Sequence, residues 1–236
     1  MKRFFYLGLA TAMFFATSCS NDEFAGSNSA KNAQMTFSLD VDGVIGTRAA
    51  GEGANADMLV YSLFDAEGNL ISTLPNATGG MVVANDAFAS GNSESISLSL
   101  VKGQTYTINF WAQDSDCDAY QLTAEDGGLK VEVDYNGVNN DETRDAFYAS
   151  ETFTVEGDAE LQVVLKRPFA QINLGVSTED WNAALASGVN ITSSKVVIKN
   201  AANTINLFDG SVSGETVVSY DFAAVPSTAT RAASNL

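Results

Sequence analysis

The chain has 236 residues, a formal net charge of −17 and 45% hydrophobic residues, and it contains no histidine. Histidine-based metal sites, Ser-His-Asp and Cys-His nucleophilic catalysis and imidazole pH switches are therefore excluded. The excess of acidic residues disfavours nucleic acid and other polyanions as partners, and its ordinary role is solubility. We expect a non-enzymatic protein that carries no cofactor.

Residues 1–18 have the features of a secretory signal peptide. Two basic residues precede an apolar run at 4–15, which is shorter than the roughly 20 residues that a membrane span needs. Small residues at 16–18 stand directly before Cys19, and this arrangement resembles a bacterial lipobox. We predict that Cys19 becomes the lipidated first residue of the mature chain. Plain secretion, with Cys19 as a bystander thiol, is the alternative.

Residues 19–32 are small and polar, a composition typical of a flexible tether. Asp22 and Glu23 follow the lipid site, and their placement resembles the surface-export signal of Bacteroidetes lipoproteins, although tether solubility explains the same acids. We expect a lipid-anchored protein of the cell outer membrane, exposed at the surface. Once Cys19 carries lipid, only Cys117 remains, so stability must come from an apolar core and not from a disulfide.

Alternating apolar residues predict the first strand. Met35, Phe37, Leu39 and Val41 are separated by polar residues, the pattern of a half-buried strand. A glycine-bounded segment follows at 43–56. Beyond it, apolar runs that flank short turn-forming segments predict two hairpins, one from 59–64 and 70–74 and one from 96–100 and 106–110.

The rest of the chain also favours strands. One helix is predicted near 178–187, where a polar residue starts the segment, Glu179 and Asp180 lie in the first turn and Gly188 closes it. The remaining strands are predicted at 129–135, 146–149, 153–155, 161–165, 191–199, 202–208 and 217–222.

Many short strands without a fixed repeat period predict an all-β fold, a Greek-key β-sandwich of the transthyretin-like type. Pro168, preceded by two basic residues, interrupts the apolar strands and suggests a domain boundary. We therefore predict an N-terminal β-sandwich domain at 33–165 and a partial C-terminal β domain at 166–236. The polar end of that second domain is either a disordered tail or a stop before the natural domain end.

A short acidic segment is a weak candidate for a calcium loop. Asp114, Asp116 and Asp118 have the spacing of oxygen ligands, with Glu125 eleven residues after the first. Ala119 stands where that loop needs glycine, so a solvated acidic loop is the preferred interpretation. Cys117, inside the segment, has no basic neighbour in sequence and is expected to be an inert thiol.

Carbohydrate chemistry is the other possibility that the residues leave open. Trp111, Tyr120, Tyr135 and Trp181 could stack on sugars, but their positions fit core packing equally well. A carboxylate-pair glycosidase would need two acids held in a cleft, and the sequence singles out no pair.

Several short strings, together with the lipobox and the first strand, resemble the fimbrillin-like lipoproteins of Bacteroidetes, the type V pilins and their relatives. These strings are GTRAA at 46–50, DAFYA at 145–149 and KRPFAQINL at 166–174. The resemblance spans most of residues 1–210. It implies a β-sandwich, a cell-surface location and a structural or adhesive role in a pilus-like assembly.

The resemblance also implies a maturation mechanism. In that family an arginine-specific protease cuts the loop after the first strand, and a strand of another subunit then fills the vacated groove. On this sequence the cut falls between Arg48 and Ala49, and the excised strand runs from Met35 to Val41. The partners would be other pilin-like subunits. Once the lipid-bearing piece has been removed, the protein would be located in the fimbrium. The alternative is that Arg48 is an ordinary surface arginine in a flexible loop.

One feature departs from the family pattern. Family pilins are similar in donating a strand from the C-terminal end, whereas after Phe222 only Val225 interrupts a run of small, mainly polar residues. The sequence therefore favours an anchor, a tip component or a non-polymerising relative over a stalk subunit. The rival function is a monomeric, surface-anchored binding module for glycans that never exchanges strands.

Overall fold

The computed structural model describes residues 31–41, 56–88, 93–136, 142–170, 176–189 and 193–222. The predictions at Cys19, Arg48 and Ala49 and the predicted C-terminal tail lie outside the described residues. The described strands are β1 (Asn32–Val41), β2 (Met58–Asp65), β3 (Val82–Asn85), β4 (Ser93–Val101), β5 (Thr105–Gln113), β6 (Tyr120–Glu125), β7 (Gly128–Val133), β8 (Ala146–Thr154), β9 (Ala159–Leu165), β10 (Ser194–Asn206) and β11 (Val212–Phe222). A 3-10 turn (Glu142–Arg144) and one helix, α1 (Thr178–Ala186), complete the described elements.

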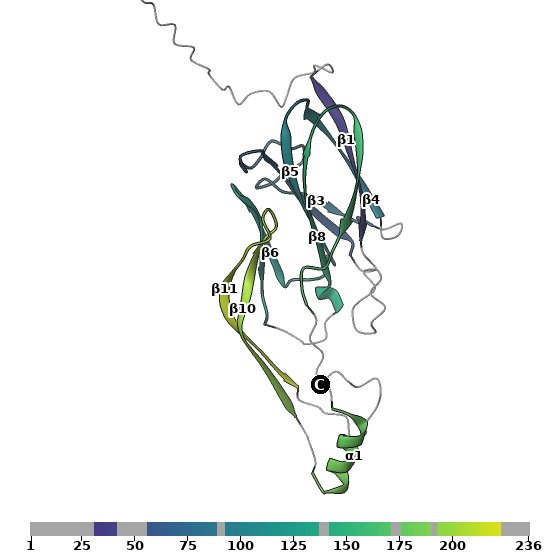
Figure 1. Ribbon diagram of the computed structural model, residues 1–236, viewed down its shortest axis with the longest axis vertical. Helices are drawn as coiled ribbons and strands as arrows, with labels where there is room; N and C mark the ends of the chain where they lie inside the picture. Colours follow the sequence, from purple (N-terminus) through teal and green to yellow (C-terminus); the bar gives the residue numbers. More distant parts are fainter. Residues whose placement is uncertain are drawn as a thin grey trace, which may run out of the picture.

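The strands form three sheets (Figure 1). The first has the order β4-β1-β9, the second β3-β2-β5-β8 and the third β11-β10-β7-β6. One apolar core joins the first and second sheets into a sandwich, and a second core joins the other face of the second sheet to the third. The predicted all-β sandwich is confirmed, with an additional sheet stacked on it.

The second sheet lies in the middle and is therefore buried on both faces. In β2, Leu59 and Leu63 contribute to the core of the sandwich, while Val60 and Phe64 contribute to the core under the third sheet. Strand β5 follows the same pattern, with Trp111 on the side of the third sheet. This double burial explains why β2 is a nearly continuous apolar run in the sequence, and why β5 buries even polar residues such as Thr107 and Asn109.

The predicted hairpin from 96–100 and 106–110 is wrong in its pairing. Strands β4 and β5 are consecutive but lie in different sheets, because the turn at 102–104 crosses the sandwich edge. Backbone contacts hold this crossing: the Lys102 N–H donates to Lys31, and that of Gly103 donates to Val155. The other predicted hairpin forms only next to its turn, where Phe64 bridges Leu70 in antiparallel pairing and the N–H of Ile71 donates to the carbonyl of Leu63 at 2.8 Å. Beyond this turn no named strand forms up to residue 74, and β3 pairs with β2 instead. Local turn signals could not predict that β4 pairs with β1 or that β3 pairs with β2, since both pairings join segments that the turns do not connect.

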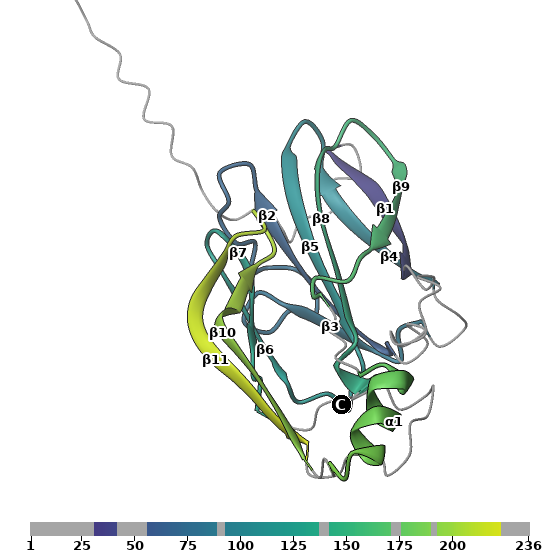
Figure 2. The same ribbon diagram turned by 60° about the horizontal axis from the view of Figure 1, so that its bottom comes forward.

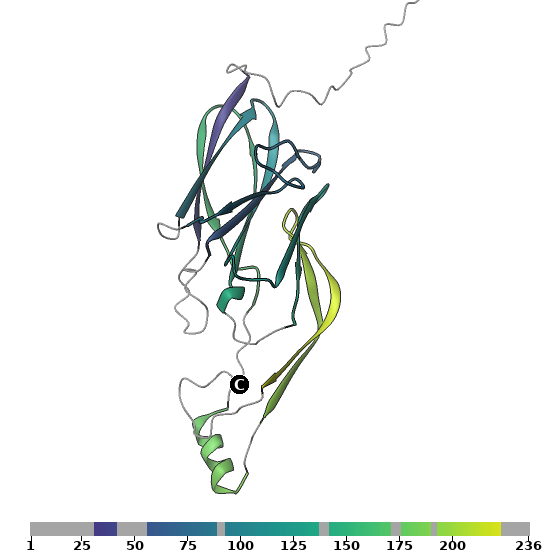
Figure 3. The ribbon, with the colours of Figure 1, turned by 180° about the vertical axis from the view of Figure 1, so that it is seen from behind.

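The third sheet combines two segments that are distant in sequence (Figure 3). The β6–β7 hairpin is inserted between β5 and β8, and β7 pairs with β10 through Thr204 opposite Glu132 and Ile205 opposite Val131. The hydrogen-bonded pairing therefore crosses the predicted boundary at residue 166. The two-domain division itself stays a prediction.

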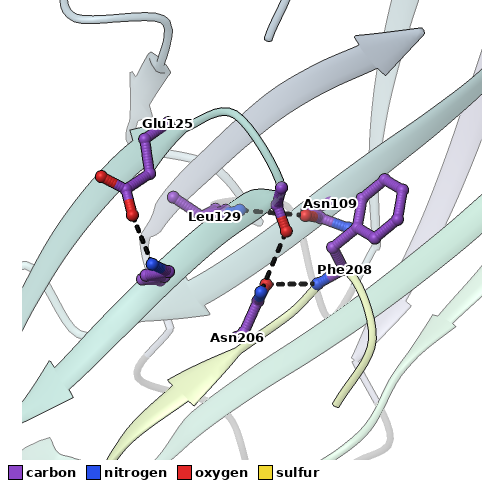
Figure 4. Close-up of polar contacts among 7 residues, drawn as sticks. Asn109, Glu125, Leu129, Asn206 and Phe208 are labelled. Atoms are coloured by element: carbon purple, nitrogen blue, oxygen red, sulfur yellow. Dashed lines mark hydrogen bonds and ion pairs between the residues drawn. The ribbon is translucent and has the colours of Figure 1, made fainter. Parts of the chain in front are cut away.

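A buried amide ties the third sheet to the middle one (Figure 4). Asn109 of β5 is fully buried, and its Oδ1 accepts the N–H of Leu129 at 3.2 Å. Its Nδ2 donates to Ser150 Oγ at 2.8 Å and lies 3.5 Å from the carbonyl oxygen of Leu207. Because buried polar groups are costly without partners, this amide fixes how the two sheets align.

Asn206 makes a second polar contact in the same place (Figure 4). Its Nδ2 donates to the carbonyl of Gly127 at 2.9 Å, and its Oδ1 accepts the N–H of Phe208 at 3.0 Å. Gly128 has φ +141°, and a Cβ added to it would lie 2.1 Å from Asn206 Oδ1. Only glycine fits this position, where the β6–β7 turn meets the end of β10.

Helix α1 lies beyond the sandwich, near the far end of the β10–β11 ribbon (Figure 2). Ser177 accepts the N–H of Asp180 at 3.1 Å, so it is the N-cap, and two acids occupy the first turn. Gly188 follows the helix with φ +77°. The predicted helix near 178–187 is confirmed. Within the described part of the chain, no helix is long and apolar enough to cross a bilayer.

We expect Asn109→Ala to lower the free energy of unfolding by about 2–4 kcal/mol, because each buried group left unpaired costs roughly 1–3 kcal/mol. Urea denaturation measures this change. Asn85→Ala, at an exposed position in β3, is the matched control and should change stability by less than about 0.5 kcal/mol. Equal effects of the two substitutions would contradict the role assigned to Asn109.

Candidate functional site: the groove occupied by β1

Strand β1 is the middle strand of the first sheet. It runs antiparallel to β4, with Phe37 opposite Ile96, and parallel to β9, with Phe37 beside Leu161. Both of its edges are therefore hydrogen-bonded. The parallel pairing with β9 is non-local, since the two strands are separated by most of the described sandwich.

The inner face of β1 is apolar throughout. Phe37 and Leu39 have no exposed surface, and the Phe37 ring packs edge-on against Phe110 at 5.7 Å and Phe153 at 5.2 Å. These contacts span the sandwich from the first sheet to the second. The buried residues of this face are Ala33, Met35, Phe37, Leu39 and Val41.

The outer face of β1 is polar and hydrogen-bonded to its neighbours. Thr36 lies 3.0 Å from Ser97 of β4, measured between the hydroxyl oxygens. Ser38 donates to Glu160 of β9 at 2.6 Å, and Asp40 accepts from Ser93 at 2.5 Å. Side chains of β1 thus reinforce the backbone pairing on both edges.

Removal of β1 would create a groove of defined shape. Neighbouring strands lie about 4.8 Å apart, so β4 and β9 would be left about 10 Å apart with facing rows of unpaired backbone groups. Below them, the pockets of five inner side chains would open. Such a groove accepts one extended strand with apolar residues at alternate positions.

The segment that follows β1 includes Arg48 and Ala49 and lies outside the described residues, as does Cys19. The four residues of the predicted excised strand, in contrast, are all described, and all four point into the sandwich core. Sequence reasoning thus identified the inward-facing side chains of β1. It could not identify β4 and β9 as the strands that hold them.

The acidic segment at 114–118 forms a hydrogen-bonded turn. Asp114 Oδ1 accepts the N–H of Asp116 at 2.9 Å, and the N–H of Cys117 donates to the carbonyl of Asp114 at 3.1 Å. Asp57 accepts from the N–H and hydroxyl of Ser115 at 2.7 and 2.9 Å. Among the described residues, no group of three acids or cysteines could hold a metal ion. Asp118 lies beside a cleft formed with the third sheet.

The candidate sugar-stacking aromatics lie mainly in the core. Trp111 is fully buried, and its N–H donates to Gln113 at 2.8 Å. Tyr120 stacks on Phe169 with ring centroids 5.6 Å apart and donates its hydroxyl proton to the carbonyl of Arg144. Burial raises the pKa of the Tyr120 phenol above its ordinary range. Trp181 of α1 is also buried.

A polar cleft of about 650 Å³ opens where β10 diverges from β7. The two strands pair only from Thr204 to Asn206, and earlier residues of β10 pair with β11 alone among the described strands. Sequence reasoning missed this cleft because its walls come from four separate segments, around 118–121, 132–136, 203 and 216–219. Its side chains are mostly acids, amides and hydroxyls, including Gln121, Glu132, Asp134, Asn203, Thr216 and Ser219.

Hydrogen bonds brace one wall of the cleft. The Arg144 guanidinium donates to the carbonyls of Asp134 at 2.9 Å and Asn136 at 2.7 Å. The Tyr135 hydroxyl donates to the carbonyl of Ala202 at 2.7 Å and so joins this wall to β10. Burial, with a smaller effect of the nearby Tyr220, raises the pKa of the Tyr135 phenol. The cleft is therefore a polar, acid-lined surface, and hydrogen bonds hold its wall in place.

The fold and the β1 groove define a class of protein: an all-β sandwich whose first strand fills a groove between β4 and β9. The chain belongs to a family described as a family of unknown function, DUF6562, whose model matches residues 27–235. No curated protein matches the sequence.

Solved structures share the fold at low sequence identity. A candidate adhesin from Bacteroides thetaiotaomicron has a TM-score of 0.51 and 11% identity, over 82% of this chain and 63% of the other. A candidate polysaccharide-binding protein from the same organism has a TM-score of 0.48 and 13% identity, over 79% and 64%. The fimbrial anchor protein Mfa2 from Porphyromonas gingivalis has a TM-score of 0.45 and 13% identity, over 80% and 66%. The chain thus spans less than two thirds of each.

We expect Phe37→Ala to destabilise the protein by about 3–5 kcal/mol, because it leaves a cavity between the two sheets of the sandwich. Gln34→Ala, at an exposed position on the same strand, should cost less than about 0.5 kcal/mol. The midpoints of urea unfolding compare the two. A small effect at Phe37 would mean that β1 is not an integral part of the core.

Proposed function

We propose that the protein is a structural or adhesive subunit of a cell-surface, pilus-like assembly. It is exported as a lipoprotein on Cys19, cleaved after Arg48, and joined to other subunits by a strand that replaces β1. The role requires no catalysis and no cofactor. Before cleavage the outer membrane holds the protein through its lipid; after cleavage the assembly holds it.

The position of β1 is the observation that supports this proposal best. The strand is hydrogen-bonded on both edges and contributes five buried side chains to the core. Each fully buried Val, Leu, Phe or Met side chain stabilises by roughly 1.5–3 kcal/mol. A subunit that loses β1 therefore loses much of its stability and regains it only when another strand enters. That large difference would make strand addition practically irreversible.

The chain order makes β1 removable. It precedes every other described strand, and Arg48 lies between its last residue, Val41, and the first residue of β2, Met58. A single cut there separates β1 from the rest of the sandwich without interrupting another described element. The same cut would release Cys19 together with the strand, so the lipid would serve delivery only.

The comparisons agree with this proposal at the level of the fold. The candidate adhesin with a TM-score of 0.51 shares the fold over 82% of this chain. The role itself comes from the sequence resemblance to fimbrillin-like lipoproteins and from the geometry of β1.

The test is cleavage of the purified chain with an arginine-specific protease. We expect a cut after Arg48, identified by mass spectrometry, followed by ladders that resist SDS as freed grooves take up strands from other subunits. Arg48→Gln should stay intact at this bond and give no ladder. Cleaved protein that remains monomeric would contradict assembly by strand addition.

A monomeric binding module for glycans is the second candidate function, and the cleft between β7 and β10 favours it. The amides and hydroxyls of the cleft can bind sugar hydroxyl groups, and its volume is within the range of small-ligand sites. Its carboxylates, among them Asp118, Glu132 and Asp134, would repel uronic acids and sulfated sugars. The cleft therefore suits neutral or amino sugars.

Titration with neutral oligosaccharides tests this second function. We expect Glu132→Gln to weaken binding about tenfold, the effect of losing about 1.4 kcal/mol of charge-assisted hydrogen bonding. Glu151→Gln, at an exposed position of β8, is the control and should bind as the unsubstituted protein does. Absence of binding across a neutral glycan panel would eliminate this candidate. Hydrolysis that disappears with Glu132→Gln would instead indicate a glycosidase.

A further inference from the structure

The outer edge of β4 has no partner strand among the described residues. Strand β4 pairs with β1 along nine consecutive positions, from Val101 opposite Asn32 to Ser93 opposite Asp40. No described strand pairs with its other edge. The register with β1 is regular throughout, so no bulge twists the edge away from an incoming strand.

The other free edges in the described sheets carry features that discourage pairing. Native edge strands are usually short, or interrupted by charge, glycine or bulges. Strand β4, in contrast, is nine residues long and has no charged residue, proline or glycine between Ser95 and Val101. The protective features elsewhere are the four-residue length of β3, Glu125 in β6, Glu151 in β8, Glu160 in β9, and Gly214, Glu215 and Asp221 in β11.

The two faces of β4 differ in polarity: the outward face is rich in serine and the inward face is mainly apolar. Serine occupies four of the five outward positions, at 93, 95, 97 and 99, and these four residues are exposed; Val101 occupies the fifth. Inward, Leu98 and Leu100 are buried, whereas Ile96 is only partly covered by the core. An added strand with the same alternation would extend the serine row and cover Ile96.

We propose that β4 is a homotypic interface, in which it pairs antiparallel with β4 of a second copy of this chain. Pairing over the full nine residues places a twofold axis at Ser97. Each serine then lies opposite a serine, or opposite Val101 at the ends, and Ile96 lies opposite Leu98 of the second copy. The two first sheets become one continuous sheet of six strands.

The charges are compatible with this pairing. Glu94 is the second residue of β4, and Lys102 follows the last residue of the strand, so antiparallel pairing brings each Glu94 near Lys102 of the second copy. The net charge of −17 opposes association, but β4 itself contains only one acid. Charges further apart than about 8 Å are largely screened at physiological ionic strength. A second copy of this chain is thus the partner whose alternation of serine and apolar residues, and whose charges, both match those of β4.

This interface is independent of the proposed function. It uses the edge of β4 that points away from β1, so it forms while β1 is in place and requires no cleavage. A failure of strand exchange after cleavage would leave it unaffected. Conversely, a monomeric intact protein would leave the exchange proposal untouched.

Sedimentation of the intact chain carrying Cys19→Ala tests the interface, since this change removes the lipid site. We expect a monomer–dimer equilibrium that depends on protein concentration. Ser97→Lys places two like charges directly opposite each other in the dimer and should weaken dimerisation at least tenfold. Ser95→Lys is the matched control, because its partner across the axis is Ser99; it should dimerise as the parent does. A parent that stays monomeric at high micromolar concentration overturns the proposal.

Oxidative crosslinking tests the register separately. In the Cys19→Ala chain, Ser97→Cys places the two new thiols on strands whose opposed Cα atoms lie about 4.5–5.5 Å apart, which suits a disulfide. Ser95→Cys places them about 13 Å apart along the strands, too far to bridge. We expect a disulfide-linked dimer from the first variant only. Equal crosslinking of both variants, or none, would refute pairing about Ser97.

Discussion

The double pairing of β1 is the constraint on which the sandwich depends. Strands β4 and β9 do not contact each other as neighbours; β1 joins them by hydrogen bonds on both edges and by side-chain contacts to Ser97 and Glu160. The first sheet therefore exists only while this position is filled. Phe37 extends the dependence to the second sheet through its edge-on contacts with Phe110 and Phe153.

The middle sheet carries a different requirement, because its two faces must both be covered. The first sheet covers one face and the third covers the other, where Asn109 accepts from Leu129 and so sets the alignment. Misaligned packing of these two otherwise apolar surfaces would leave the buried amide and its partners unpaired, which is costly away from water. The third sheet is thus docked specifically, while its β10–β11 ribbon extends past β7 and forms the polar cleft.

Three features that could serve an assembly occupy different parts of this architecture. The groove of β1 lies inside the first sheet, the free edge of β4 at its margin, and the cleft at the end of the third sheet. Each has a distinct chemistry: apolar pockets with facing edges, a serine-rich edge, and an acid-lined polar surface. Because none shares a strand edge with another, strand exchange, homotypic pairing and ligand binding could coexist in one molecule.

Periodicity alone determined the inner face of β1, the all-β class and helix α1, since alternation and capping depend only on neighbours in sequence. The same local signals predicted a β4–β5 hairpin that the fold rejects. Only the tertiary structure decided that β4 and β5 lie in different sheets, that β1 pairs with β9, and that β7 meets β10. Such pairings are settled by which apolar faces must cover one another. A strand buried on both faces, such as β2, is a nearly continuous apolar run, but that run does not identify its partner strands.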